Sequence, residues 1–385
     1  MKAGWEKKTL GKLCRLISGQ HIDSKDYNTE SRGVGYLTGP SDFGPMTPII
    51  SKWTEHPKVL ANSGDILLTV KGSGVGKINL LGQNEIAISR QLMAVRVTGA
   101  DPRFIYAFLS SAFDHFQSLS TGAAIPGISR EQVLSLEIAI PSFSEQQRIV
   151  NILDEAFEGI ATAKANAEKN LKNARSLFES HLQAVFSQRG VEWVEKKLGE
   201  VYDVRDGTHD SPKYHDTGYP LITSKNLKRE GLSFDNVKLI SEQDYNKIND
   251  RSAVHKGDVL LAMIGTIGNP TLVTVEPNFA IKNVALFKIK NGHSGAFLKH
   301  YLGSEWVISK MMNEAKGTTQ KFVGLGYLRD FPINVPPFAA QLNIVEHLDK
   351  FSLKTQNLES IYQQKLAALD ALKKSLLDQA FSGNL

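Results

Sequence analysis

The pattern of apolar and polar positions divides the chain into two kinds of segment. Residues 1–142 and 189–337 contain short apolar runs, such as Ile66–Val70, that are separated by Gly, Pro and Asn residues. Short runs with this punctuation are typical of strands joined by turns. The run Phe104–Leu109 follows Asp101-Pro102 and predicts a helix on the outside of the sheet. We therefore expect two mixed domains of helices and strands, which we call head 1 (1–142) and head 2 (189–337).

The segments 143–188 and 338–385 have a different pattern. The first has no proline and one glycine between Ser144 and Ser187, and the second has neither between Ala339 and Ser382. Apolar residues step by three and four along both segments, as in a coiled coil. These seam positions are Leu153, Ala156, Ile160, Ala163 and Ala167, and then Leu348, Phe351, Thr355, Leu358, Tyr362, Leu366, Leu369, Leu372 and Leu376. Small residues on one seam and leucines on the other predict an antiparallel pair within the chain. Two long helices packed separately on their own heads are the alternative.

The starts and lengths of these helices can also be predicted. Ser144 is followed three residues later by Gln147, which predicts a capping box at the start of the first helix. The second copy has Ala340 where the first has Glu145, so its cap is expected to be weaker. At 1.5 Å per residue, each helix of about 44 residues would be a rod of roughly 65 Å.

The second half of the sequence repeats the first. Residues 138–154 and 333–349 are identical at eight of seventeen positions, including Pro141/Pro336 and Gln146/Gln341. Further matches are Trp5/Trp193, Lys8/Lys196, Leu10/Leu198, Gly11/Gly199, Gly19/Gly207, His21/His209, Gly64/Gly257 and Asp65/Asp258. An internal duplication of this kind predicts one fold used twice, related by a pseudo-two-fold axis. The copies differ most across 22–58 and 210–250, which suggests one task performed on two targets.

Composition and charge narrow the class of protein. Hydrophobic residues make up 41% and charged residues 22%, and Cys14 is the single cysteine, so we expect a globular protein without a disulfide framework or a cysteine-based zinc site. No apolar run reaches the roughly 20 residues of a membrane span, and the first residues do not resemble a signal peptide, which together predict a cytoplasmic protein. Lys plus Arg minus Asp plus Glu is 15 − 12 in head 1 and 20 − 17 in head 2, but 5 − 6 and 5 − 5 in the helical segments. Two basic blocks could each neutralise phosphates, although slightly basic soluble domains would give the same counts.

The candidate motifs for catalysis fail on inspection. Gly72–Lys77 is rich in glycine, but Ile78 stands where a P-loop needs Ser or Thr, and the spacing is not GxGxxG. This run is either a turn that approaches a phosphate or a purely structural hairpin. Val335–Phe338 resembles an amino-methyltransferase motif without its asparagine, so we interpret its prolines as helix entry. The histidines show no metal-ligand spacing, and His21 and His209 are interpreted as structural. The sequence predicts no catalytic residue and no metal site.

The whole chain resembles the DNA-specificity subunit of type I restriction–modification enzymes. The resemblance is carried by the opening of each head, by Gly64–Leu67 and Gly257–Leu260, and above all by Ile140–Val150. It implies two target-recognition domains, each reading one half of a bipartite double-stranded DNA site, separated by two long antiparallel spacer helices. It also implies partners. Two modification subunits would bind S-adenosylmethionine and methylate adenine N6, and restriction subunits would use ATP and Mg²⁺ to translocate and cut DNA. This chain would bind none of those cofactors.

Three loop clusters in each head offer side chains suited to base and phosphate contacts, because Arg pairs with guanine, Asn or Gln with adenine, and Ser or Thr with either. The candidate residues are Thr38, Ser41, Lys71, Ser73, Lys77, Ser89, Arg90 and Gln91 in head 1, and Thr223, Ser224, Lys225, Asn226, Thr266, Lys282 and Asn283 in head 2. Any one of them could instead be a solvated group or a phosphate contact, so the prediction concerns the set. Two other functions remain open: a self-contained methyltransferase or nuclease with an unrecognised site, and a coiled-coil scaffold that binds only proteins.

Overall fold

The computed structural model of the protein describes residues 4–82, 84–120, 126–188, 190, 192–228, 230–317 and 320–385. The chain forms two compact units. Unit 1 consists of residues 1–167 and 364–385, and unit 2 of residues 168–363. Each unit therefore contains one head together with parts of both long helices, and each is described by itself.

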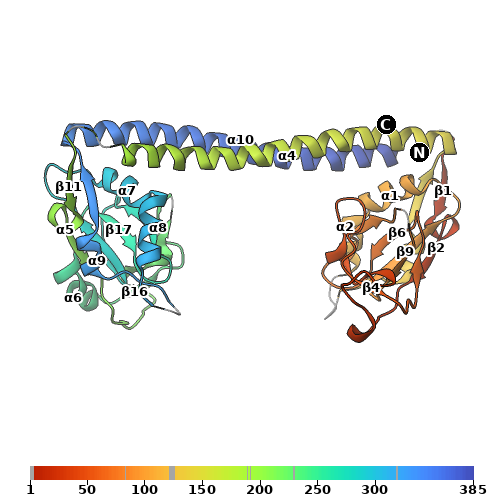
Figure 1. Ribbon diagram of the computed structural model, residues 1–385, viewed down its shortest axis with the longest axis horizontal. Helices are drawn as coiled ribbons and strands as arrows, with labels where there is room; N and C mark the ends of the chain where they lie inside the picture. The colour runs from red at the N-terminus through yellow and green to blue at the C-terminus, as the bar shows by residue number, and fades with distance from the viewer. Residues whose placement is uncertain are drawn as a thin grey trace. The chain divides into compact units, whose positions relative to one another are not determined.

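In unit 1 (Figure 1) the described residues of the head form three sheets. Strands β2 (Cys14–Ser18), β9 (Leu92–Val97), β6 (Ile66–Thr69) and β7 (Ile78–Leu80) form an antiparallel sheet in that order. Strands β4 (Trp53–Thr54), β3 (Val34–Leu37), β8 (Ile86–Ile88) and β5 (Leu60–Ala61) form a second sheet, in which β3 and β8 are parallel. Strands β1 (Glu6–Thr9) and β10 (Glu137–Ile140) form an antiparallel pair. The helices are α1 (Pro102–Ser111), α2 (Phe113–Leu119) and α3 (Arg130–Leu134), and α1 confirms the predicted outer helix.

Unit 2 repeats this topology. Strands β12 (Asp203–Asp206), β20 (Val284–Lys288), β17 (Val259–Ala262) and β18 (Gly268–Leu272) form the antiparallel sheet, and β11 (Val194–Lys197) pairs with β21 (Pro332–Val335). In the other sheet, β16 (Lys238–Ile240), β13 (Tyr219–Ile222) and β19 (Ala280–Ile281) again include one parallel pair, β13 with β19. The hairpin β14 (Leu227–Lys228) and β15 (Gly231–Leu232) and the helices α5 (Leu198–Val201), α6 (Glu242–Ser252), α7 (Gly295–Gly303), α8 (Glu305–Glu314) and α9 (Leu325–Asp330) complete the head. The shared order confirms the predicted duplication.

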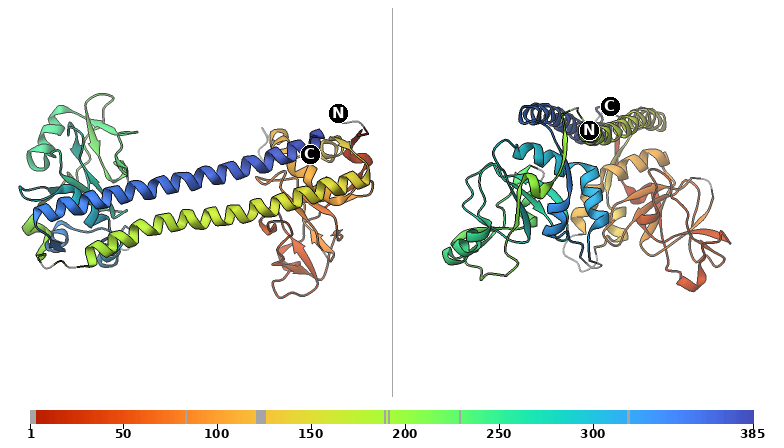
Figure 2. Two further views of the ribbon diagram at one scale, coloured as in Figure 1. Left: turned by 90° about the horizontal axis from the view of Figure 1, so that it is seen from above. Right: turned by 60° about the vertical axis from the view of Figure 1, so that its left-hand side comes forward.

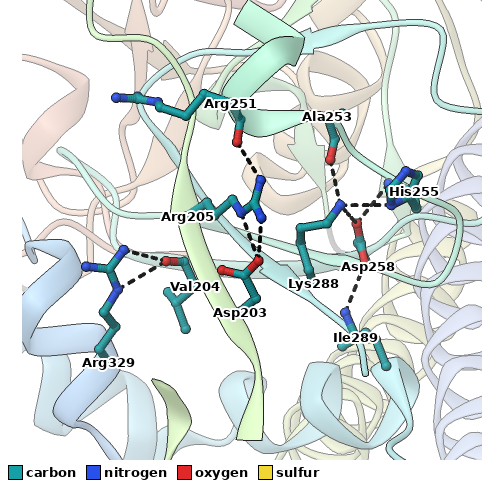
Figure 3. Close-up of polar contacts among 10 residues, drawn as sticks. All are labelled: Asp203, Val204, Arg205, Arg251, Ala253, His255, Asp258, Lys288, Ile289 and Arg329. Carbon is teal, nitrogen blue, oxygen red and sulfur yellow. Dashed lines mark hydrogen bonds and ion pairs between the residues drawn. The ribbon is translucent and has the colours of Figure 1, made fainter. Parts of the chain in front are cut away.

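The repeated Gly-Asp pair is a turn with a buried aspartate that leads into a central strand. Gly64 and Gly257 have φ of +84° and +93°, a region that favours glycine. In unit 1 the buried Asp65 carboxylate accepts a bidentate pair from Arg96 at 2.9 and 2.8 Å and the Asn62 N–H at 2.8 Å. In unit 2 the equivalent Asp258 accepts from the backbone N–H groups of His255 and Ile289 and from the Lys288 ammonium at 3.4 Å (Figure 3). Each aspartate thus holds the start of one central strand.

The long helices are α4 (Phe143–Ser187) and α10 (Phe338–Ser382). In unit 1 the Lys164 ammonium lies 2.6 Å from the Asp370 carboxylate, and Lys373 lies over the Phe157 ring at 4.9 Å. In unit 2 Arg175 pairs with Glu359 at 3.1 Å, while Phe178 and Leu182 share a core cluster with Leu348. In both units, higher numbers on α4 meet lower numbers on α10. The pair is antiparallel, as predicted, and the helices run side by side in Figure 2.

The seam prediction is correct at some positions and wrong at others. Leu153, Ile160, Ala167, Leu348 and Thr355 are buried. Leu358 and Leu372, however, are 38% and 47% exposed. Glu359, one position after Leu358, lies on the inner face instead and pairs with Arg175. α10 carries leucines on two neighbouring faces, so a spacing of three or four residues does not show which face is buried. The contacts with α4 decide which face packs inward.

The start of α4 also differs from the prediction. The helix begins at Phe143, and the backbone N–H of Gln146 donates to the Ser142 carbonyl, so Ser144 lies inside the first turn and does not form the predicted capping box. The glutamine has another role. Gln146 is buried, accepts the N–H of Asp101 at 2.8 Å and donates to the Pro141 carbonyl at 2.9 Å. It therefore ties α4 to the residue that caps α1.

Unit 2 has the same junction. Gln341 accepts the N–H of Ser294, the cap of α7, at 2.9 Å and donates to the Pro336 carbonyl at 3.0 Å. A second repeated residue joins helix and head, because Asp349 contacts His300 of α7 at 2.7 Å, and its counterpart Asp154 pairs with Arg103 of α1. Burial lowers the pKa of His300 despite the nearby Asp349 carboxylate. The repeated motif at the start of each long helix therefore fixes the angle between helix and head.

We expect Asp65→Ala to destabilise unit 1 by about 3 kcal/mol, because it leaves the Arg96 guanidinium and the part-buried Asn62 N–H without their acceptor. Hydrogen–deuterium exchange measured by mass spectrometry on the full chain should show β6 and β9 exchanging roughly 100-fold faster at neutral pH. Asp65→Asn keeps an acceptor and should have a smaller effect. Peptides of unit 2 are the internal control, and equal acceleration in both units would contradict a local role.

Candidate nucleic-acid interface

The three predicted clusters of head 1 lie together. The Ser89 hydroxyl donates to the Thr38 carbonyl, and the Val70 N–H donates to the Gln91 carbonyl at 2.8 Å. A Cβ on Gly39 would lie 2.2 Å from the Gln91 side-chain oxygen, so the Gln91 side chain lies directly against Gly39. The turn at 72–77 touches the same place, since a Cβ on Gly74 would lie 2.6 Å from the Pro40 ring. Segments 38–41, 71–77 and 89–91 therefore share one surface.

Two candidates on this surface are engaged inside the head. The Thr38 N–H and hydroxyl both donate to the Asp42 carboxylate, at 2.6 and 2.8 Å. Ser89 is 3% exposed, and its hydroxyl points to the Thr38 carbonyl. Burial raises the pKa of Tyr36, which lies on β3 two residues before Thr38. The candidates that remain exposed are Ser41, Lys71, Ser73, Lys77, Arg90 and Gln91.

In head 2 the equivalent clusters surround a hollow of about 570 Å³. Its lining includes the predicted residues Thr223, Ser224, Lys225, Asn226, Lys282 and Asn283. Thr266 lines a neighbouring hollow of about 280 Å³, which shares Ser224 and Lys225 with the first. The structure thus brings all seven candidates of head 2 to one region.

Asn226 is a structural residue within this region. It is 6% exposed, its carbonyl oxygen accepts the Thr223 N–H and hydroxyl at 3.0 Å, and its amide donates to the Ser233 carbonyl. Asp42 makes the same pair of contacts with Thr38 in head 1. In both heads a threonine is thus held by the side chain three or four residues later, and this contact is part of the shared scaffold.

Sequence reasoning missed several residues that line the hollow of head 2, among them Tyr214, Asp235, Asn236, Lys238 and Gln320. Tyr214 and Lys238 belong to the divergent segment 210–250, where no repeat partner marks them. Tyr214 is 47% exposed, and a large exposed aromatic beside lysines is suited to stacking on bases or sugars. In head 1, Lys52 from the divergent segment 22–58 likewise reaches the clusters and donates to the Thr38 hydroxyl at 3.3 Å. The only sign of these residues in the sequence was that the two copies differ most in the segments that contain Lys52, Tyr214 and Lys238.

The glycine-rich turn has a structural explanation. Gly72 and Gly76 have φ of +91° and +85°, and their counterparts Gly265 and Asn269 have +77° and +50°. Gly72 donates its N–H to the Pro126 carbonyl, and Gly265 donates to the Lys321 carbonyl, both at 2.8 Å. These N–H groups are used inside the protein and are not free for a phosphate. This favours the hairpin interpretation over a phosphate cradle.

No group of three or more His, Cys, Asp or Glu side chains among the described residues is placed to hold a metal ion. Burial raises the pKa of the Cys14 thiol to about 12, so it is not a thiolate nucleophile at neutral pH. No helix that the structure describes is long and apolar enough to cross a membrane.

Two duplicated mixed heads on an antiparallel helix pair, each with a polar loop surface, define a class of two-headed recognition protein. The family model described as "Type I restriction modification DNA specificity domain" matches the chain twice, at residues 2–173 and 190–367. The chain belongs to this family, as its sequence predicted.

Known relatives are similar over different parts of the chain. The putative type I restriction enzyme MjaX specificity subunit of Methanocaldococcus jannaschii is 28% identical over 175 residues, which are 44% of this chain and 40% of that protein. The type I restriction enzyme EcoKI specificity subunit of Escherichia coli K12 is 22% identical over 73% of this chain and 65% of its own length. The EcoBI specificity subunit of Escherichia coli is 20% identical over 99% and 86%. The matches to the first two thus span less than two thirds of the relative's length.

Solved structures share the fold. One similar chain comes from a structure described as the basis of complex assembly and conformational transition of the type I R-M system. The alignment covers 100% of this chain and 99% of that chain, with a TM-score of 0.80 and 20% identity. The HsdS subunit from Thermoanaerobacter tengcongensis aligns over 100% and 98%, with a TM-score of 0.64 and 20% identity. These likenesses support two heads and paired helices as one family architecture.

Proposed function

We propose that this protein is the DNA sequence-specificity subunit of a type I restriction–modification complex, in which each head reads one half of a bipartite double-stranded DNA site. The observation that carries the proposal is the pair of equivalent polar loop surfaces built on one duplicated scaffold. The scaffold residues recur, whereas the exposed residues on the loops differ. A shared scaffold with different loop residues would let both heads bind DNA in the same orientation while each contacts a different base sequence.

The differing side chains suit different bases. Arg90 in head 1 occupies the position equivalent to Asn283 in head 2. Arginine pairs in bidentate fashion with guanine O6 and N7, whereas asparagine pairs with adenine N6 and N7. The exposed lysines Lys71, Lys77 and Lys225 suit phosphates, which position a protein without reading sequence.

The partners and cofactors follow from the family. In this proposal two modification subunits carry S-adenosylmethionine, and restriction subunits supply ATP- and Mg²⁺-dependent translocation and cleavage. This chain contributes recognition and assembly, not catalysis. The failure of Gly72–Lys77 to match a nucleotide-binding pattern supports that assignment.

The long helices offer a surface for the modification subunits. Nine of the eighteen large apolar side chains that are exposed in the described part of the chain lie on α4 and α10. They are Phe143, Ile152, Leu177, Phe338, Leu342, Leu353, Leu358, Ile361 and Leu372. Single exposed apolar residues are ordinary, but a concentration of them on two helices is typical of a protein interface.

The proposal is tested by selecting bound duplexes from a random DNA library with the complex reconstituted from this chain and its modification subunits. We expect two short specified tracts separated by an unread gap of fixed length. Arg90→Ala should relax one position of one tract by about 1–3 kcal/mol and leave the other tract intact. Lys282→Ala and Asn283→Ala should affect only the second tract.

Two outcomes would favour the alternatives. Methyl transfer or cleavage by the pure chain alone would indicate a self-contained enzyme. Binding without any sequence preference in the complex would indicate a protein-only scaffold. If none of the three substitutions alters selection, the loop clusters are not the DNA surface.

We expect the double variant Leu353→Glu/Ile361→Glu to lose its stable association with the modification subunits, because it places two charges in an apolar contact. These side chains are 60% and 56% exposed, so the fold should tolerate the change. The affinity should fall at least about 30-fold, since buried apolar anchors contribute 2 kcal/mol or more each. Val275→Glu, at a 41% exposed position outside the long helices, is the matched control. Analytical size exclusion measures both, and equal behaviour would contradict docking on α10.

The helices should also set the gap. Inserting seven residues after Ala167 and seven after Gln363 keeps the three-four seam in phase and lengthens each helix by roughly 10 Å, about three base pairs. Methylation-site sequencing should then show the same two tracts with a longer gap. Activity should fall, because three base pairs turn DNA by about 100° and misalign one head. Efficient methylation with the original gap would show that the helices do not set the spacing.

A further inference from the structure

His209, interpreted from sequence as a structural residue, is part of a chain of polar side chains in head 2. The segment 206–211 lies beside the start of β20, where the Gly207 N–H donates to the Val284 carbonyl and the Asn283 N–H to the Thr208 carbonyl. A Cβ on Gly207 would lie 2.2 Å from the Ile281 carbonyl oxygen, so glycine permits this approach. The repeated glycine therefore brings the His209 ring against Asn283.

Four side chains follow one another in this chain. The Arg251 guanidinium lies 3.0 Å from Asp206 Oδ1, and Asp206 Oδ2 lies 2.8 Å from His209 Nε2. His209 Nδ1 lies 2.8 Å from Asn283 Oδ1. Arg251 is itself held in place, because Arg205 donates to its carbonyl (Figure 3). The chain ends at Asn283, which lines the hollow of head 2.

The position of the protons on His209 fixes the orientation of the Asn283 amide. A carboxylate only accepts, so His209 Nε2 carries a proton that it donates to Asp206. When Nδ1 is also protonated, it donates to Asn283 Oδ1, and the amide NH₂ remains free as a donor. When the ring is neutral, Nδ1 accepts, so the amide must turn over and leave its oxygen free. In the structure Asn283 Oδ1 is the atom that faces His209 Nδ1, the orientation that leaves the amide NH₂ free.

We propose that His209 is a positioning residue that selects whether Asn283 offers a donor or an acceptor to a base, so that one position of the second half-site is read differently with the protonation of the ring. The inference rests on the proposed function and deepens it. A free NH₂ suits guanine O6 or thymine O4, whereas a free oxygen suits the amino groups of adenine or cytosine. The affected base is therefore expected to change from keto to amino as the ring loses its proton.

Several charged groups surround the ring and act on its proton. The loop supplies Asp206 and Asp210, α6 supplies Asp244, Lys247 and Arg251, and β19 leads into Lys282, which donates to the Ser211 hydroxyl. The side chain of His209 is 56% exposed to solvent. Histidine is the side chain that ordinarily changes charge between pH 5 and 8.

The histidine is repeated in head 1 as His21, but the described residues there do not form the same chain of side chains. The His21 ring lies 3.5 Å from Asp23 Oδ1. Arg90 stands at the position of Asn283 and can only donate, whatever its orientation. The first half-site therefore serves as an internal reference whose base preference does not depend on the ring.

The test is competitive binding of the reconstituted complex with modification subunits to a library of second half-sites, at pH 6 and pH 8.5, with the first half-site held constant. For the wild-type protein, the ratio of keto to amino bases at one position should change about tenfold between the two pH values. A library of first half-sites should show no such change. His209→Ala should lose both the discrimination and its pH dependence at that position, and His21→Ala is the matched control in head 1.

Asp206→Asn sharpens the test. Its new amide can donate to His209 Nε2 while its oxygen accepts from Arg251, which forces the single ring proton onto Nδ1. The donor should then face the base at both pH values, so the discrimination remains and its pH dependence disappears. An unchanged wild-type preference across pH, or a His209→Ala variant that still discriminates as the wild type does, would overturn the inference. Absence of any half-site preference in the wild-type complex would instead overturn the proposed function.

Discussion

The architecture depends on one buried hydrogen-bonded side chain at the entry to each long helix. Gln146 and Gln341 are 4% and 1% exposed, and each bridges two backbone groups that would otherwise be unpaired. A buried N–H or carbonyl without a partner costs about 1–3 kcal/mol, so the glutamine has one acceptable position. The strand before the helix and the head helix beside it are therefore held at one angle. Because both units have the same junction, the angle between long helix and head is fixed in the same way in each.

The rest of each head follows a similar division between scaffold and surface. Asp65 and Asp258 close equivalent turns, although one pairs with an arginine and the other with a lysine. Thr38 and Thr223 are clamped by Asp42 and Asn226 in the same geometry. These interactions are satisfied inside the protein, which leaves the exposed loop residues free to differ. A duplicated scaffold can then carry two unrelated recognition surfaces without refolding either head.

The sequence predicted what periodicity and repetition encode, and failed where tertiary contacts decide. The duplication, the two long antiparallel helices and the outer helix α1 were correct because they rest on many residues at once. The Ser144 cap was wrong because α4 begins at Phe143, so Ser144 lies inside the helix. The junction between helix and head is made by Gln146 instead. Leu358 was misplaced because a charged residue, Glu359, supplies the inner contact. Among the loop candidates, Ser89 and Asn226 had the right chemistry but are used internally, which only the hydrogen-bond partners reveal.

The backbone of the loops constrains which side chains can read DNA there. Asn283 has φ of +55°, a left-handed conformation that asparagine tolerates better than most residues, whereas Arg90 is not among the described residues with positive φ. Placing arginine at 283 would therefore strain the backbone, of order 1 kcal/mol, as well as remove the partner of His209. The choice of base-reading residue is thus coupled to loop conformation and to the side chains behind it. A head built in this way is expected to change specificity by exchange of whole segments, such as the divergent 210–250, and not by single substitutions at one contact.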